Sequence, residues 1–355
     1  MTSDRSTQDD RAPAYHALAL QLHCRSVNGC DTREAAQVLI DDALDRTARA
    51  VAGALRFLGT DTRLVVLPEY FLTGHPMGES LEAWTAKAAI DPEGPEHEAL
   101  ARIAGEHNVF LAGNAYETDP HFPGWYFQTS FVTAPSGEQV LRYRRLISMY
   151  SPSPWDVWGP YLDAYGEDAV MPVADTELGR LAAVASEEIL YPELARLLAL
   201  KGAEVFVHSS SEVGSNRPTP KNVAKQARAF ENAAYVVSAN SAGISGSPVL
   251  AGSTDMGSQV VDYQGRVVVE AGYGESVNAF AELDIGALRR HRRRPAMSNT
   301  LARQPTQLWA RGYTAHDVQR GDELTEGSGV RLPERTHFLR RQAEVIERLS
   351  KEGVI

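Results

Sequence analysis

The chain has 355 residues, is 43% hydrophobic and 23% charged, and carries a formal net charge of −11. This length and composition are typical of a globular protein with one large core or two small ones. The acidic balance argues against general nucleic-acid binding. The one basic cluster, Arg289 to Arg294, is interpreted as a solvated or subunit-facing helix end.

Cysteine usage and the N-terminus give the next constraints. Cys24 and Cys30 show no metal-ligand spacing, so neither a zinc ribbon nor a disulfide framework is indicated. No apolar run approaches the roughly 20 residues that a membrane-spanning helix needs. Residues 1–11 are polar and lack the apolar segment of a secretory signal. We therefore expect a cytoplasmic protein that begins with a disordered tail over residues 1–13.

Taken in chain order, short apolar runs alternate with amphipathic stretches. Strands are expected at 16–23, 63–67, 109–116, 126–134, 140–143, 181–185, 205–208, 235–240, 259–262 and 267–271. Helices are expected at 32–57, 96–107, 192–201, 223–234 and 336–351. The mixture of hairpins and strand–helix units predicts an α/β fold whose sheets are covered by helices on one face. The absence of a linker-like shift in composition predicts one domain at 14–285 and a C-terminal extension at 286–355. We expect that extension to pack on a partner subunit.

Polar side chains follow three of the predicted strands. Glu69 comes directly after a buried strand and a proline, where partial desolvation suits a general base. The alternative, a solvated acid at a strand end, is disfavoured by the apolar residues on both sides. In the segment 141–147, alternation along a strand places Tyr143 and Arg145 on one face and Arg142 with Arg144 on the other. The run 181–185 ends abruptly at Ser186, which presents a small hydroxyl next to two carboxylates.

In this order and spacing, the segments resemble the nitrilase, or carbon–nitrogen hydrolase, superfamily over roughly residues 14–285. The matching segments are Leu67-Pro68-Glu69, Tyr143-Arg144-Arg145, the stretch from Ser186 to Glu193, Lys201-Gly202-Ala203-Glu204 and Arg228-Ala229-Phe230-Glu231-Asn232. The resemblance implies an αββα sandwich that pairs sheet against sheet into dimers. It also implies hydrolysis of nitriles, amides or carbamoyl groups by a glutamate base, a lysine and a cysteine nucleophile, without metal or cofactor.

Carried over residue by residue, the family's glutamate matches Glu69, whereas its lysine falls on Arg145 and its cysteine on Ser186. Serine is a weaker nucleophile than cysteine, because its hydroxyl needs a strong base held at hydrogen-bond distance. Arginine keeps its proton and presents a planar fork of donors, so it suits the holding of a carboxylate, either a substrate's or that of Glu69 itself.

Four more residues are candidates for substrate binding. They are Tyr70, Asp156, Glu187 and Tyr191. Asp156 is the weak match for a further acid that the family carries in the loop after its lysine. Aromatic residues in the segment 151–166 are consistent either with a pocket wall or with lid packing. His75, His121 and His208 follow strand ends, and scattered histidines of this kind are more often structural than catalytic.

Three functions stay open at this stage. The first is an enzyme that acts on a C–N bond of a small amide, nitrile or related acyl compound, with Glu69 as base and a divergent pair formed by Ser186 and Arg145. The second is a catalytically dead homologue that binds a small ligand or a partner. The third is a non-hydrolytic biosynthetic enzyme, a cyclase or lyase that uses Glu69 without a covalent intermediate. A further alternative is that Ser186 was introduced by engineering. Arg145 argues against this, because an engineered variant would rarely change both residues. By resemblance we also expect a homodimer or higher homo-oligomer.

Overall fold

The computed structural model describes residues 13–316, 318–327 and 329–355. The expected disordered tail therefore lies, apart from its last residue, outside the described residues. Within the described part of the chain, no helix combines the length and the apolar character needed to cross a bilayer.

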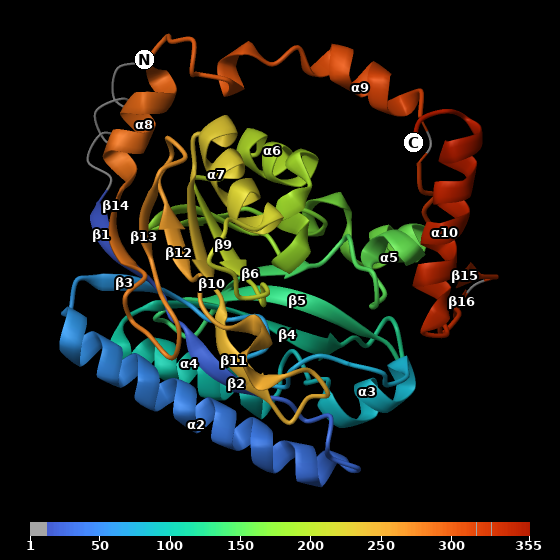
Figure 1. Ribbon diagram of the computed structural model, residues 1–355, viewed down its shortest axis with the longest axis horizontal. Coiled ribbons are helices and arrows are strands. Elements are labelled where there is room, and N and C mark those ends of the chain that lie inside the picture. The colour runs from blue at the N-terminus through green and yellow to red at the C-terminus, as the bar shows by residue number, and fades with distance from the viewer. Residues whose placement is uncertain (1–12, 317, 328) are drawn as a thin grey trace.

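Two six-stranded mixed sheets form the centre of the molecule (Figure 1). In the first sheet the order is β14 (Phe280–Asp284), β1 (Ala14–Ala19), β3 (Thr62–Val66), β4 (Phe110–Thr118), β5 (Tyr126–Thr133) and β6 (Gln139–Arg144). In the second it is β13 (Val267–Glu270), β12 (Gln259–Val261), β10 (Tyr235–Ala239), β9 (Val205–Ser209), β8 (Gly179–Ala183) and β7 (Ala174–Thr176). The central strands β1, β3 and β4, like β8, β9 and β10, run parallel to one another, and the outer strands pair antiparallel.

Helices cover the outer face of each sheet, so the predicted αββα sandwich is confirmed. Below the first sheet in Figure 1 lie α2 (Arg33–Leu58), α3 (Leu81–Ala88) and α4 (Pro95–His107). Above the second lie α6 (Pro192–Leu200) and α7 (Pro220–Asn232). Helix α2 begins where the Thr32 side chain accepts a hydrogen bond from the backbone N–H of Ala35. Its buried side chains recur every three or four residues, which gives it one apolar stripe toward the sheet.

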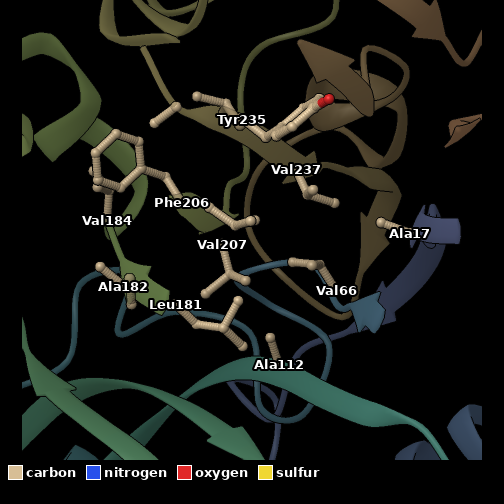
Figure 2. Close-up of a cluster of buried hydrophobic side chains, with 14 of the residues drawn as sticks. Ala17, Val66, Ala112, Leu181, Ala182, Val184, Phe206, Val207, Tyr235 and Val237 are labelled. Carbon is tan, nitrogen blue, oxygen red and sulfur yellow. The ribbon is translucent and has the colours of Figure 1, made fainter. Parts of the chain in front are cut away.

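The principal core fills the space between the two sheets (Figure 2). From the first sheet, Ala17, Val66 and Ala112 point into it, and Val207 and Val237 enter from the second. All five side chains are at most 5% exposed. Continuous apolar runs such as β8 and β9 are expected for strands buried on both faces, since one face packs on this core and the other on helices.

The remaining elements are short strand pairs, connecting helices and the C-terminal extension. A small parallel pair joins β2 (Leu22–Arg25) to β11 (Ser241–Ser245), and β15 (Thr325–Glu326) pairs with β16 (Gly329–Val330). One-turn 3₁₀ segments occur at 154–157, 167–169, 186–190, 251–254 and 301–303. The extension contains α8 (Ile285–Arg293), α9 (Thr306–Thr314) and α10 (Thr336–Lys351), and α10 lies beside α5 (Trp158–Tyr165).

The extension contacts the chain's own domain at both ends. Arg292 of α8 donates to the backbone carbonyls of Asn232 and Ala233 at the end of α7, and Arg289 pairs with Glu204. The interpretation of the basic cluster as a solvated or subunit-facing helix end was therefore wrong for these two arginines, because they cap carbonyls and a carboxylate of the same chain. Helix α9, in contrast, buries none of its side chains. Packing of the extension on a partner subunit stays a prediction.

Candidate functional site

Four strand ends bring the polar residues of the sequence analysis to one end of the sandwich. Glu69 follows β3, Arg145 follows β6, Ser186 follows β8, and a run of serines follows β9. The two sheets are joined here directly: the backbone N–H of Glu69 donates to the carbonyl of Ser210, and the hydroxyl of Ser209 donates to that of Leu67. The predicted catalytic residues thus stand on the rigid ends of strands from both sheets.

Glu69 is 4% exposed, and its carboxylate contacts the side chains of Gln128, Arg145 and Ser211. Its Oε1 accepts from the amide of Gln128 at 2.7 Å and lies 3.5 Å from a guanidinium nitrogen of Arg145. Its Oε2 accepts from the hydroxyl of Ser211. These three donors fix the orientation of the carboxylate, and a carboxylate held in this way can act as a general base.

Arg145 links the two sides of the site. Its Nη1 donates to Gln128 at 2.6 Å and pairs with Glu69, while its Nη2 forms an ion pair with Glu187, the residue next to Ser186. Its Nε donates to the carbonyl of Ile147 at 2.7 Å. Burial acts to lower the pKa of Arg145, but the surrounding carboxylates, Glu187 first, outweigh it and raise that pKa. The guanidinium is therefore permanently charged and already engaged by carboxylates of the protein.

Ser186 has an unusual backbone conformation for a residue with a side chain. Its φ of 46° lies in the left-handed region, which costs a non-glycine residue on the order of 1 kcal/mol or more. The carbonyl of Ser186 accepts from Nε2 of His208 at 2.8 Å, and Nδ1 of the same ring lies 2.8 Å from the hydroxyl of Ser238. Burial, followed by the nearby charge of Lys225, lowers the pKa of His208 well below its ordinary value. A neutral His208 therefore donates to Ser186 and accepts from Ser238, which holds the strained turn in place.

The side chain of Ser186 faces a residue that the sequence analysis did not single out. Its Oγ accepts a hydrogen bond from the Nζ of Lys221, at 3.4 Å, in the first turn of α7. Lys221 in turn lies 3.6 Å from a carboxylate oxygen of Glu212. The hydroxyl of Ser186 therefore contacts Lys221, whereas the cation that the sequence analysis predicted for the site is Arg145, after β6.

Glu188 is fully buried and fastens two loops of the site together. It accepts from the hydroxyl of Tyr143, from the backbone N–H groups of Leu146 (2.8 Å) and Ile147 (3.0 Å), and from that of Ala185 (3.2 Å). Burial raises its pKa to about 6, against the opposing effects of Arg145 and these donors. At neutral pH the carboxylate is thus largely ionised and binds the loop after β6 to the turn after β8.

The four candidate substrate-binding residues are placed differently. Glu187 is in the site through its ion pair with Arg145. Tyr70 follows Glu69 and stacks on His75 at 4.7 Å between ring centroids, and Tyr191 is 41% exposed at the start of α6. Asp156 is different, because its carboxylate is already occupied by Ser153 and by Arg341 of α10. We therefore do not carry Asp156 into the site: its observed contacts are those of a structural acid that fastens α10.

Several residues of the site carried no distinctive sequence signal. Gln128 lies in the middle of β5, and Ser211 follows β9 in a run of three serines. Lys221 follows a proline at a helix start. Of the three histidines considered, His208 contacts Ser186 through its backbone carbonyl, in a structural role. Within the described residues, no group of three or more His, Cys, Asp or Glu side chains gathers in a way that could hold a metal ion.

The assembled geometry offers a defined set of chemical groups. A buried carboxylate, a fixed guanidinium and a hydroxyl contacted by an ammonium group lie at neighbouring strand ends. Such a set can accept a proton, hold a negative charge and present an oxygen nucleophile.

Comparison with known proteins identifies a family and several relatives. The model of the carbon–nitrogen hydrolase family matches residues 35–293. Formamidases of Bacillus cereus (strain AH820) and Bacillus anthracis are 27% identical over 209 residues, or 58% of this chain. The chain spans only 57% of the length of these curated relatives.

Solved structures share the fold at low sequence identity. Nit3 of Saccharomyces cerevisiae, of the nitrilase superfamily, superposes with a TM-score of 0.59 at 24% identity, over 79% of this chain and 93% of its own. A carbon–nitrogen hydrolase of Helicobacter pylori G27 gives 0.60 at 19% identity, over 84% and 98%. A mutant of an amidase from Nesterenkonia AN1 gives 0.60 at 19% identity, over 85% and 98%.

Proposed function

Because the chain belongs to the carbon–nitrogen hydrolase family, we propose that it cleaves a C–N bond of a small amide, nitrile or related acyl compound. Glu69 acts as the base, Ser186 as the acyl acceptor, and Arg145 as the clamp that holds the carboxylates of the site. The curated relatives are formamidases, and one Nesterenkonia amidase structure carries the acetamide moiety of fluoroacetamide on its active-site cysteine. Both support a small acyl group as the substrate of this chain.

The observation that carries the proposal is the position of Arg145. One guanidinium contacts Glu69 on one side and Glu187, the neighbour of Ser186, on the other. The base and the hydroxyl thereby belong to one connected polar cluster, although they come from different sheets. The left-handed backbone at Ser186 adds to this, since strain of this kind is typical of residues that present a reactive atom.

For an amide, the reaction consists of two balanced steps. The Oγ of Ser186 forms a bond to the carbonyl carbon, and its proton passes to the carboxylate of Glu69. The C–N bond then breaks, and Glu69 returns the proton to the leaving nitrogen. In the second step water attacks the resulting ester and gives a proton to Glu69. The bond between the acyl carbon and Oγ then breaks, Glu69 returns the proton to Oγ, and the carboxylic acid leaves Ser186. No group other than water is consumed.

A second candidate function is supported by the same guanidinium. Arg145 already contacts the carboxylate of Glu69, and a serine is a poorer nucleophile than a cysteine. A homologue that binds a small ligand or partner without turning it over would carry such a site. The contact between Glu69 and Arg145, at 3.5 Å, is longer than the typical charged hydrogen bond, and this favours the enzyme.

The test is release of ammonia from a panel that includes formamide, short aliphatic amides and nitriles. We expect turnover by the wild type and its loss in both Glu69→Gln and Ser186→Ala. Turnover that survives Ser186→Ala but not Glu69→Gln would indicate chemistry without a covalent intermediate. No turnover of any member by a folded wild-type protein would refute the enzyme and favour the binding protein.

A further inference from the structure

Lys221 occupies a position that the proposed reaction has not yet used. Its Nζ donates to Ser186 Oγ at 3.4 Å, at the long end of the hydrogen-bonding range, and lies 3.6 Å from Glu212. The side chains of Lys221 and Glu212 are only 17% and 15% exposed. The contact therefore lies inside the protein rather than on its surface, where screening would weaken it.

Helix stability does not explain a lysine at this place. Lys221 is in the first turn of α7, where the helix dipole disfavours a positive charge, and that turn contains no acidic residue. One turn further along, Lys225 is fully buried and donates to Asn222 and to the carbonyl of Gly257. The contact of Lys221 with Ser186 is thus made at an electrostatic cost to the helix.

The guanidinium group of Arg145 is directed away from the hydroxyl of Ser186, to other acceptors. Its Nε, Nη1 and Nη2 are directed to a backbone carbonyl, to Gln128 with Glu69, and to Glu187. The guanidinium group of Arg145 is consequently bound to acceptors of the protein itself. The hydroxyl of Ser186, in contrast, has the Lys221 ammonium as its polar side-chain neighbour.

We propose that the ammonium group of Lys221 stabilises the negative charge that develops on Ser186 Oγ during acyl transfer. As the bond from Oγ to the substrate carbon forms, the serine proton passes to Glu69, and Lys221 keeps all of its own protons. The same ammonium stabilises Oγ again when the ester breaks and the oxygen departs from the acyl carbon. This role rests on the proposed function, because it assumes that Ser186 is the acyl acceptor.

The charge at Oγ can be measured without any substrate. In a Ser186→Cys variant, the introduced thiol occupies the position of the hydroxyl, and its pKa reports the local potential. A cation within about 4–6 Å lowers the pKa of an acid by about 1–3 units. We expect the introduced thiol to have a pKa at least about 1 unit lower in Ser186→Cys than in Ser186→Cys with Lys221→Gln. The readout is thiolate absorbance, or the rate of iodoacetamide alkylation at that residue, against pH.

Two further variants make the result specific. Lys221→Arg in the Ser186→Cys background keeps the charge and is expected to keep the low thiol pKa. Lys201→Met removes an exposed lysine at the end of α6 and is expected to leave it unchanged. An equal thiol pKa with and without the Lys221 charge would overturn the inference.

Failure of the inference and failure of the proposed function are distinguishable. If the wild type forms no acyl-enzyme with any substrate, the proposed function fails, whereas the thiol pKa still reports the Lys221 charge. If the wild type acylates and Lys221→Gln acylates equally fast, the function stands and the inference is overturned. Loss of one preorganised donor typically costs about 10²–10³-fold in rate, so we expect acylation of Lys221→Gln to be slower by at least 10-fold.

Discussion

Replacement of Glu188 by glutamine tests how the site is held together. The carboxylate accepts hydrogen bonds on both oxygens, from Tyr143, Leu146 and Ile147 on Oε1 and from Tyr143 and Ala185 on Oε2. Glutamine has nearly the same shape, but it presents an acceptor on one side only. In the orientation that keeps the two backbone N–H groups after β6, its NH₂ faces the N–H of Ala185.

The magnitude follows from the contacts that are lost. Hydrogen bonds to a charged group contribute about 1.5–3 kcal/mol each, and a buried donor left without an acceptor costs about 1–3 kcal/mol. The neutral glutamine also avoids the cost of burying a charge, which the raised pKa of Glu188, about 6, reflects, and this offsets part of the loss. We expect Glu188→Gln to lower the free energy of unfolding by about 2–4 kcal/mol at pH 7.5.

Urea denaturation followed by far-UV circular dichroism measures this free energy, with Glu193→Gln as the control. Glu193 is exposed in the first turn of α6, and its substitution should change stability by less than about 0.5 kcal/mol. The effect of Glu188→Gln should also grow as the pH falls below 6, since the folded wild type then binds a proton at this carboxyl more tightly than the unfolded chain does, and glutamine has no such proton to bind. A change below about 1 kcal/mol at pH 7.5 would refute the assignment of Glu188 as the tie between the two loops.

Two further predictions concern buried charges. Burial lowers the pKa of Lys225 to about 8, so the unfolded chain binds its proton more tightly than the folded one between pH 8 and about 10.5. As the pH rises through this window, the unfolding free energy of the wild type should therefore increase relative to that of Lys225→Met by up to about 3 kcal/mol. A difference that does not change with pH would contradict the account. Arg341→Met leaves the buried carboxylate of Asp156 without its arginine and should expose α10 to limited proteolysis. Arg340→Met removes an arginine of an exposed ion pair and should not. Equal cleavage rates in the two variants would show that the buried pair does not fasten α10.

Most of the sandwich could be predicted from apolar periodicity. Runs such as 63–67, 181–185 and 205–208 correspond closely to β3, β8 and β9, because a strand buried on both faces leaves a continuous apolar signature. Strand β14 at 280–284 was not predicted. It pairs antiparallel with β1 at a sheet edge, where half of its side chains are solvated and the apolar signal is weak.

The site was predictable only where a residue ends a strand. Glu69 and Ser186 were singled out because each follows an apolar run, and Arg145 because of strand alternation and the family resemblance. The structure brings the segments of these three residues together, and their catalytic roles stay a prediction. Lys221 and Gln128 were not found, because one lies in a helical turn and the other within a strand, and only tertiary packing brings them to the site. The role of Asp156 depends on an arginine 185 positions later in the chain, which no local pattern reveals.

Intact-protein mass spectrometry tests the central claim most directly. The wild type, Ser186→Ala and Ser186→Cys are each incubated with small amides, nitriles and activated esters. The account predicts a mass increase equal to the acyl group in the wild type, and its absence in Ser186→Ala. Adducts that form in Ser186→Cys while none forms in the wild type would contradict it, because the pocket would then be intact without covalent chemistry at the serine.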